Sequence, residues 1–111
     1  MAEKWLAAFN RGDIRWLAGY SAVPFLAGGN TAAEDGNELR TLYRDLLHDG
    51  PKALGELTVY TAAQIKKRLG RLPPGGDEED MVFATARGGS IDLVLILQEA
   101  DRGWRIVGLN R

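Results

Sequence analysis

The segment Ile91–Leu97 constrains the fold more than any other part of the sequence, because it is apolar on both sides of an extended chain. Successive side chains of a strand point to opposite faces of the sheet. Val94 and Ile96 alternate with the leucines of this segment, and Asp92 is its single acidic residue. An antiparallel strand with one face in water would alternate apolar and polar residues. Both faces of this strand are therefore expected to be covered.

Amphipathic helices of the same chain can cover one face of such a sheet. The other face is covered either by the same chain curling round or by a second subunit. A core of this size also gains stability from association. We therefore predict a homodimer that forms through the sheet face.

Length and composition restrict the remaining choices. The 111 residues indicate one domain, 1–111. Fourteen basic and fifteen acidic residues argue against nucleic acid as a partner. No apolar run approaches the ~20 residues of a membrane helix, and Met1–Trp5 does not resemble a secretory signal, so we predict no membrane partner and a cytoplasmic location. Cysteine is absent and His48 is the only histidine, and no metal or cofactor is predicted.

The first third of the chain carries helix signals. Trp5 and Phe9 share one face of a predicted helix over 2–11, which Gly12 ends. Asp13 is placed to cap a second short helix over 14–19.

A third helix has the clearest pattern. Asp35 and Glu38 are the N-cap and N3 acid of a capping box. A stripe that faces the core follows at helical spacing: Leu39, Leu42, Tyr43, Leu46 and Leu47. His48 lies near the end of the helix, where a cationic imidazole interacts well with the helix dipole, and Gly50-Pro51 stops it.

Strands and loops connect these helices. The run 23–27 contains a proline, which predicts an edge strand or an extended segment, and 31–34 is its hairpin partner. A strand over 57–60 is followed by a capping box and a helix over 62–69. The polar stretch 72–80 is expected to be an exposed loop.

The last third predicts an antiparallel meander. Strands are expected over 81–87, 91–99 and 104–110. Gly88-Gly89 is typical of a tight hairpin turn, and Asp101-Arg102-Gly103 of a slightly longer hairpin loop.

This order of elements resembles the NTF2-like superfamily, also described as SnoaL-like or as a cystatin-like α+β cone. Phe9-Asn10-Arg11-Gly12-Asp13 is similar to the F-x-x-G-D junction of that family, and the turn followed by Trp104-Arg105-Ile106 is similar to its D-G-x-W-R-I ending. The resemblance implies an α+β fold with a curved antiparallel sheet of four to six strands wrapped around the N-terminal and central helices. It also implies frequent dimers and, often, a conical apolar cavity.

Enzymes of this family have catalytic sets that this chain mostly lacks. The ketosteroid-isomerase type has an Asp base on the early strand pair, whereas 23–27 contains no acid. The scytalone-dehydratase type uses two histidines, and only His48 is present. The epoxide-hydrolase type uses an Asp-Arg-Asp set, for which Arg87 and Asp92 are conceivable members without a second acid. No catalytic residue is assigned.

Six residues are candidates for lining a ligand cavity. They are Trp5, Phe9, Tyr20, Tyr43, Tyr60 and Asp92. The alternative for the aromatic residues is that they belong to the core, with the tyrosine hydroxyls at its edge. The alternative for Asp92 is an exposed acid that pairs with Arg87 across a hairpin; inside a cavity, its raised pKa would suit acid/base chemistry.

Three functions remain open. The first is a non-catalytic module that binds a hydrophobic small molecule or assembles as a dimer. The second is a cavity enzyme, of the isomerase, dehydratase or hydrolase type, that uses Asp92 and a tyrosine. The third is an adaptor that binds another protein through the outer sheet face. The basic cluster 66–71 is interpreted as a solvated helix face.

Overall fold

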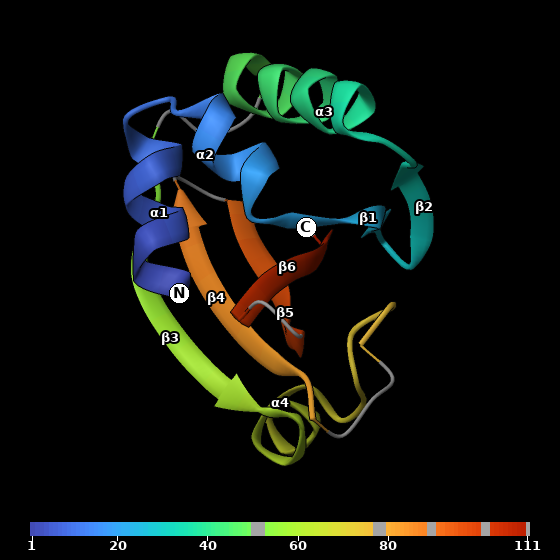
Figure 1. Cartoon of the computed structure of the whole chain (residues 1–111). Helices are drawn as coiled ribbons and strands as arrows, with labels where there is room; N and C mark the ends of the chain where they lie inside the picture. Colours follow the sequence, from blue (N-terminus) through green and yellow to red (C-terminus); the bar gives the residue numbers. More distant parts are fainter. Residues whose placement is uncertain (50–52, 77–79, 89–90, 101–102, 111) are drawn as a thin grey trace.

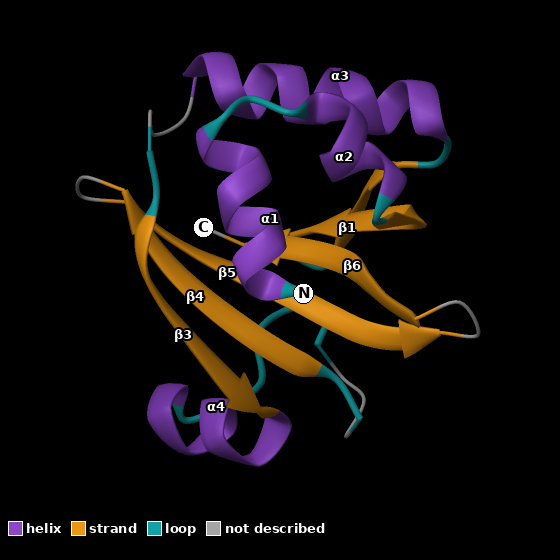
Figure 2. Ribbon diagram, turned by 60° about the vertical axis from the view of Figure 1, so that its left-hand side comes forward, coloured by secondary structure: helices purple, strands orange, loops and turns teal. Residues whose placement is uncertain are grey.

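The computed structural model describes residues 1–49, 53–76, 80–88, 91–100 and 103–110. Within them, six strands form one curved sheet, with three helices against one face and the fourth helix on the other side (Figures 1 and 2). The helices are α1 (Ala2–Asn10), α2 (Ile14–Gly19), α3 (Gly36–Asp49) and α4 (Ala62–Leu69). The strands are β1 (Ser21–Ala27), β2 (Asn30–Ala33), β3 (Gly55–Thr61), β4 (Val82–Gly88), β5 (Ile91–Ala100) and β6 (Gly103–Asn110).

The strand order is β2-β1-β6-β5-β4-β3, and neighbouring strands are antiparallel except β1 and β6, which run parallel. The predicted α+β fold with a curved antiparallel sheet is confirmed, with this one parallel pair added. Because most of the chain separates β1 from β6, no turn in the sequence indicates their direction. The turn at Gly88-Gly89 and the loop 101–103 were also predicted; residues 89 and 101–102 lie outside the described part of the chain.

The expectation of an edge strand at 23–27 is wrong, because β1 lies between β2 and β6. A proline lacks the N–H that a regular ladder needs. The register between β1 and β6 shifts between Ser21 and Leu26. Pro24 falls within this shift, so its missing N–H interrupts no regular ladder.

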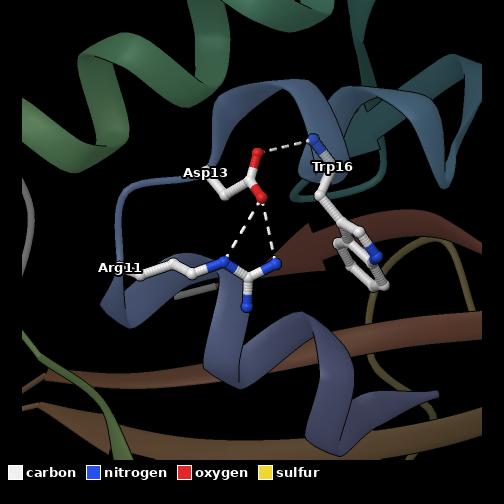
Figure 3. Close-up of polar contacts among 3 residues, drawn as sticks. All are labelled: Arg11, Asp13 and Trp16. Atoms are coloured by element: carbon white, nitrogen blue, oxygen red, sulfur yellow. Dashed lines mark hydrogen bonds and ion pairs between the residues drawn. The ribbon is translucent and has the colours of Figure 1, made fainter.

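The predicted cap of α2 is confirmed. The Trp16 amide donates to Asp13 Oδ1 at 3.0 Å, and Arg11 Nη2 donates to Asp13 Oδ2 at 3.0 Å (Figure 3). The Trp16 hydrogen bond, followed by the one from Arg11, lowers the pKa of Asp13. The carboxylate thus begins α2 and ties it to the end of α1.

The two later helices have the predicted N-cap residues, but at α3 the Glu38 carboxylate bonds to the Glu34 amide and not to the Asp35 amide of a complete capping box. The Glu38 amide donates to Asp35 Oδ1 at 2.8 Å, and the Glu38 carboxylate accepts from the Glu34 amide at 3.0 Å. Thr61 and Gln64 form a complete reciprocal box at α4. Each cap supplies partners for amides that have none within the helix.

The inner core fills the space between α1–α3 and the sheet. Its largest fully buried side chains include Trp5, Phe9, Leu17, Phe25, Leu39, Tyr43, Leu93, Leu95 and Ile106. These side chains pack the interior of the cone.

The second face of the sheet is covered in part by the chain itself. Ala62 and Ile65 of α4 pack with Met81, Phe83 and Ile96. The sequence left two alternatives for this face, cover by the same chain or by a second subunit. At Phe83 and Ile96 the cover comes from the same chain. Among the helices described, none is long and apolar enough to cross a membrane.

The segment 72–76 adds to this cover. Pro73 and Gly76 are buried, which corrects the prediction of an exposed loop over 72–80; residues 77–79 are not described. A Cβ built on Gly76 would lie 2.7 Å from Cζ of Phe83, so the glycine lets this segment rest on the Phe83 ring. Asn110 holds the segment in place by donating to the Pro74 carbonyl at 3.0 Å.

Candidate functional site

The six candidate residues lie in three separate places. Trp5, Phe9 and Tyr43 are buried in the inner core, where the Trp5 and Phe9 rings stack with centroids 5.2 Å apart. Their rings are almost completely removed from solvent and pack among the other apolar side chains in the interior of the cone.

The polar atoms of this buried group bond to one another. Trp5 Nε1 donates to the Tyr43 hydroxyl at 3.3 Å. Ser21 Oγ donates to the Leu17 carbonyl at 2.7 Å and lies 2.7 Å from the Tyr43 hydroxyl. Because the Ser21 proton is used at Leu17, the Tyr43 hydroxyl donates to Ser21. Burial raises the pKa of Tyr43, which keeps the hydroxyl protonated.

Tyr20 lies away from this group, and 41% of it is exposed. Its ring stacks on Trp16 with centroids 4.5 Å apart. The Arg105 guanidinium lies 5.7 Å from the centre of the Tyr20 ring and donates to the Gly19 carbonyl at 2.6 Å. Tyr20 therefore belongs to a surface stack at the end of α2.

Tyr60 and Asp92 border an open pocket on the second face of the sheet. Arg87 Nε donates to Asp92 Oδ1 at 2.8 Å, and the Asp92 side chain is 62% exposed. The hydrogen bond from Arg87 lowers the pKa of Asp92. Asp92 is thus an exposed acid that pairs with Arg87, which was the alternative to a position inside a cavity. Its pKa is lowered, whereas a buried general acid would have a raised pKa.

Sequence reasoning did not identify the groove that lies beside α3. It has a volume of about 790 Å³ and runs between α3, the β1–β2 hairpin and the end of β6 (elements seen in Figure 1). The lining residues are Ala27, Gly28, Ala32, Glu38, Thr41, Leu42, Asp45, Leu46, Asp49 and Leu109.

The floor of the groove is apolar, and its strand side is made of small residues. Ala27 and Ala32 come from the hairpin, where larger side chains would occupy the space. Leu42, Leu46 and Leu109 complete the apolar surface. The groove thus offers an apolar surface that remains open to solvent.

Three carboxylates from α3 line the same groove. Glu38, Asp45 and Asp49 are seven and then four residues apart, which places them along one helix face. Glu38 is held by the Glu34 amide, and the Asp49 carboxylate lies 2.8 Å from Nδ1 of His48. Within the described part of the chain, Asp45 has no hydrogen-bond or ion-pair partner, and the groove is lined by no lysine or arginine.

These carboxylates do not form a metal centre. Eleven residues of helix span about 16 Å, which separates Glu38 from Asp49. The described residues contain no cluster of three metal-binding side chains. The signal in the sequence was the helical spacing of three acids beside the apolar stripe of α3. Only the fold places the small residues of the hairpin opposite them.

Comparison with known proteins identifies the fold. No family model and no curated protein matches the chain. The chain is similar to a solved protein of unknown function with a cystatin-like fold from Nostoc punctiforme, with a TM-score of 0.54 and 12% identity over 98% of this chain and 82% of that one. It is also similar to an NTF2-like protein of unknown function from Pseudomonas putida, with a TM-score of 0.54 and 11% identity over 98% and 78%.

A second Nostoc punctiforme structure, a domain of unknown function with a cystatin-like fold, gives a TM-score of 0.53 and 16% identity over 98% of this chain and 70% of that chain. Likeness at such low identity is evidence for the fold alone, because function depends on the site. The NTF2-like fold expected from the sequence is confirmed.

Proposed function

We propose that this chain is a non-catalytic binding module that holds a hydrophobic small molecule in the groove beside α3. The observation that carries the proposal is the open apolar floor formed by Ala27, Ala32, Leu42, Leu46 and Leu109. Binding sites for small molecules are concave and mostly apolar, with a few polar groups, and have volumes of about 300–1,000 Å³. The groove has these properties.

The energetics favour an apolar occupant. Each methylene group that leaves water contributes about 0.8 kcal/mol. Leu46 and Leu109 are already mostly buried, so a ligand would extend an existing apolar surface. Ala27 and Ala32 leave the room that the ligand would occupy.

Two observations favour binding over the cavity enzyme. That alternative needs an acid with a raised pKa near a free tyrosine hydroxyl. Asp92 is exposed and its pKa is lowered, whereas the Tyr43 hydroxyl is bonded to Ser21 and Trp5. Neither residue lines the groove.

Assembly as a homodimer is the second candidate function. The area available for it on the second sheet face is reduced, because α4 and the segment 72–76 cover Phe83 and Ile96. The homodimer and the cytoplasmic location stay predictions. The molar mass in solution, measured by light scattering, tests the homodimer.

The binding proposal is tested with a neutral apolar dye, N-phenyl-1-naphthylamine. We expect its fluorescence to rise on binding and the amide resonances of groove residues to shift in a ¹⁵N spectrum. Ala32→Phe fills the groove and is expected to weaken dye binding by about tenfold. Thr31→Phe is the matched control, because Thr31 is the neighbouring exposed residue of β2 and does not line the groove.

Two results would contradict this proposal. One is that both phenylalanine variants bind the dye as the parent chain does. The other is that the shifted resonances lie outside the groove. Circular dichroism on both variants verifies that they are folded.

A further inference from the structure

We infer that the groove beside α3 selects molecules that carry an ammonium group on an apolar body. This inference rests on the proposed function and names the class of ligand. The apolar floor and the charges that border it together favour such a ligand.

The charges around the groove favour a cationic ligand. Glu38, Asp45 and Asp49 contribute three negative charges to the lining, and within the described residues no lysine or arginine balances them there. Opposite charges attract and like charges repel at short range. A fatty acid or a phosphate ester would meet repulsion in this groove, whereas an ammonium group would meet attraction.

The contacts of the three carboxylates assign different roles to them. Glu38 accepts from the Glu34 amide at 3.0 Å, so it already has a partner just before the helix. Asp49 lies beside the exposed ring of His48. Asp45 lies between them along the helix and has no partner within the described part of the chain, so it is the carboxylate most available to a ligand.

The position of Asp45 connects the charge to the apolar floor. Leu42 precedes it by three residues and Leu46 follows it directly, and all three line the groove. Residues three or four apart are neighbours on a helix surface. An ammonium group at Asp45 would therefore leave its alkyl or aryl body against Leu42 and Leu46.

The size of the groove selects a small molecule as the occupant. About 790 Å³ matches a drug-sized ligand. A lysine side chain of another protein would present the same ammonium chemistry, and binding only to lysine-containing peptides, without binding to free amines, would overturn the inference.

The test compares three probes with the same eight-carbon chain: octylammonium, octanol and octanoate. Binding is followed by ¹⁵N spectra at pH 7 and low salt, below the concentrations at which the probes form micelles. We expect octylammonium to bind about tenfold more tightly than octanoate, with octanol between them. Added salt should weaken octylammonium binding and leave octanol unchanged.

Asp45→Asn removes the charge with little change in shape. We expect it to weaken octylammonium binding by about fivefold and to leave octanol binding unchanged. Glu99→Gln makes the same change in net charge at an exposed position of β5 outside the groove lining, and should change neither.

The outcomes separate this inference from the proposed function. Equal affinities for octylammonium and octanol, unaffected by Asp45→Asn, would overturn the inference while the groove still bound apolar molecules. Failure of all three probes and of the neutral dye to bind would overturn the proposed function as well.

Discussion

The side-chain amide of Asn10 pairs with both backbone polar groups of Leu54. The Leu54 amide donates to Asn10 Oδ1 at 2.8 Å, and Asn10 Nδ2 donates to the Leu54 carbonyl at 2.9 Å. Asn10 thus makes with Leu54, the residue before β3, the two hydrogen bonds that a residue of a neighbouring strand would make. This pair joins the end of α1 to the edge strand of the sheet across 44 positions of sequence.

Asn10→Ala is expected to lower the free energy of unfolding by about 1–3 kcal/mol, because two hydrogen bonds are lost. Urea denaturation measures the change. Lys4→Ala, at an exposed position of the same helix, is the control and should leave the unfolding midpoint unchanged. Equal midpoints for the two variants would show that the Asn10–Leu54 pair does not stabilise the fold.

Tyr43→Phe is expected to lower the free energy of unfolding by about 1–3 kcal/mol. The substitution leaves the buried Trp5 N–H without its acceptor and removes the donor to Ser21. Chemical denaturation is the measurement. Tyr20→Phe is the matched control, since Tyr20 is exposed and its hydroxyl has no such role. A loss of the same size in both variants would contradict the role assigned to the buried network.

The raised pKa of Tyr43 predicts that the protein loses stability at alkaline pH. Burial raises the pKa of Tyr43 in the folded state above the ordinary value of 10.0. The unfolded chain therefore releases this proton at lower pH than the folded protein, so the contribution is fully present below pH 10 and declines as the pH rises towards the folded-state pKa. The free energy of unfolding should fall above pH 10 by up to about 1.4 kcal/mol per pH unit.

The control for this pH dependence is Tyr43→Phe. Its stability should decline less steeply above pH 10 than that of the parent chain, because the other titrating groups are common to both. Parallel curves for the two proteins would be evidence against the raised pKa of Tyr43.

Gly76→Ala is expected to destabilise the protein by about 1–3 kcal/mol, because the added methyl group would overlap the Phe83 ring. Thermal unfolding measures the effect. Gly19→Ala is the matched control, since a Cβ at Gly19 meets no atom within 4 Å. Combining Gly76→Ala with Phe83→Leu should cost less than the sum of the two single changes. Strict additivity would refute this packing of the segment 72–76 on Phe83.

Local rules account for much of the secondary structure. Asp13, Asp35 and Thr61 each begin a helix because a side-chain oxygen accepts from the amide three residues further on, which is a relationship within one turn of chain. The two-sided apolar pattern of Ile91–Leu97 likewise predicted cover on both faces. Leu95 packs in the inner core and Ile96 in the core of the second face.

The arrangement of the groove beside α3 could not be predicted from local rules in the sequence. Tyr43 and Asp45 are two residues apart, yet one is sealed in the core and the other lines the groove. Helical spacing shows that they point in different directions. It does not show that Ala27, Ala32 and Leu109 lie opposite Asp45 and leave space.

Taken by itself, the sequence determined the helices and most strand positions, because caps, turns and periodic apolar residues act over a few neighbouring positions. The order of these elements and the resemblance of two short motifs then indicated the fold. The tertiary structure decided the parallel pairing of β1 with β6, the packing of Gly76 on Phe83, and the groove beside α3. The strand pairing and the groove depend on segments far apart in the chain, which meet only when the sheet has curved round its core. The Gly76–Phe83 contact spans seven positions, but it forms only where the chain folds back onto the second face of the sheet.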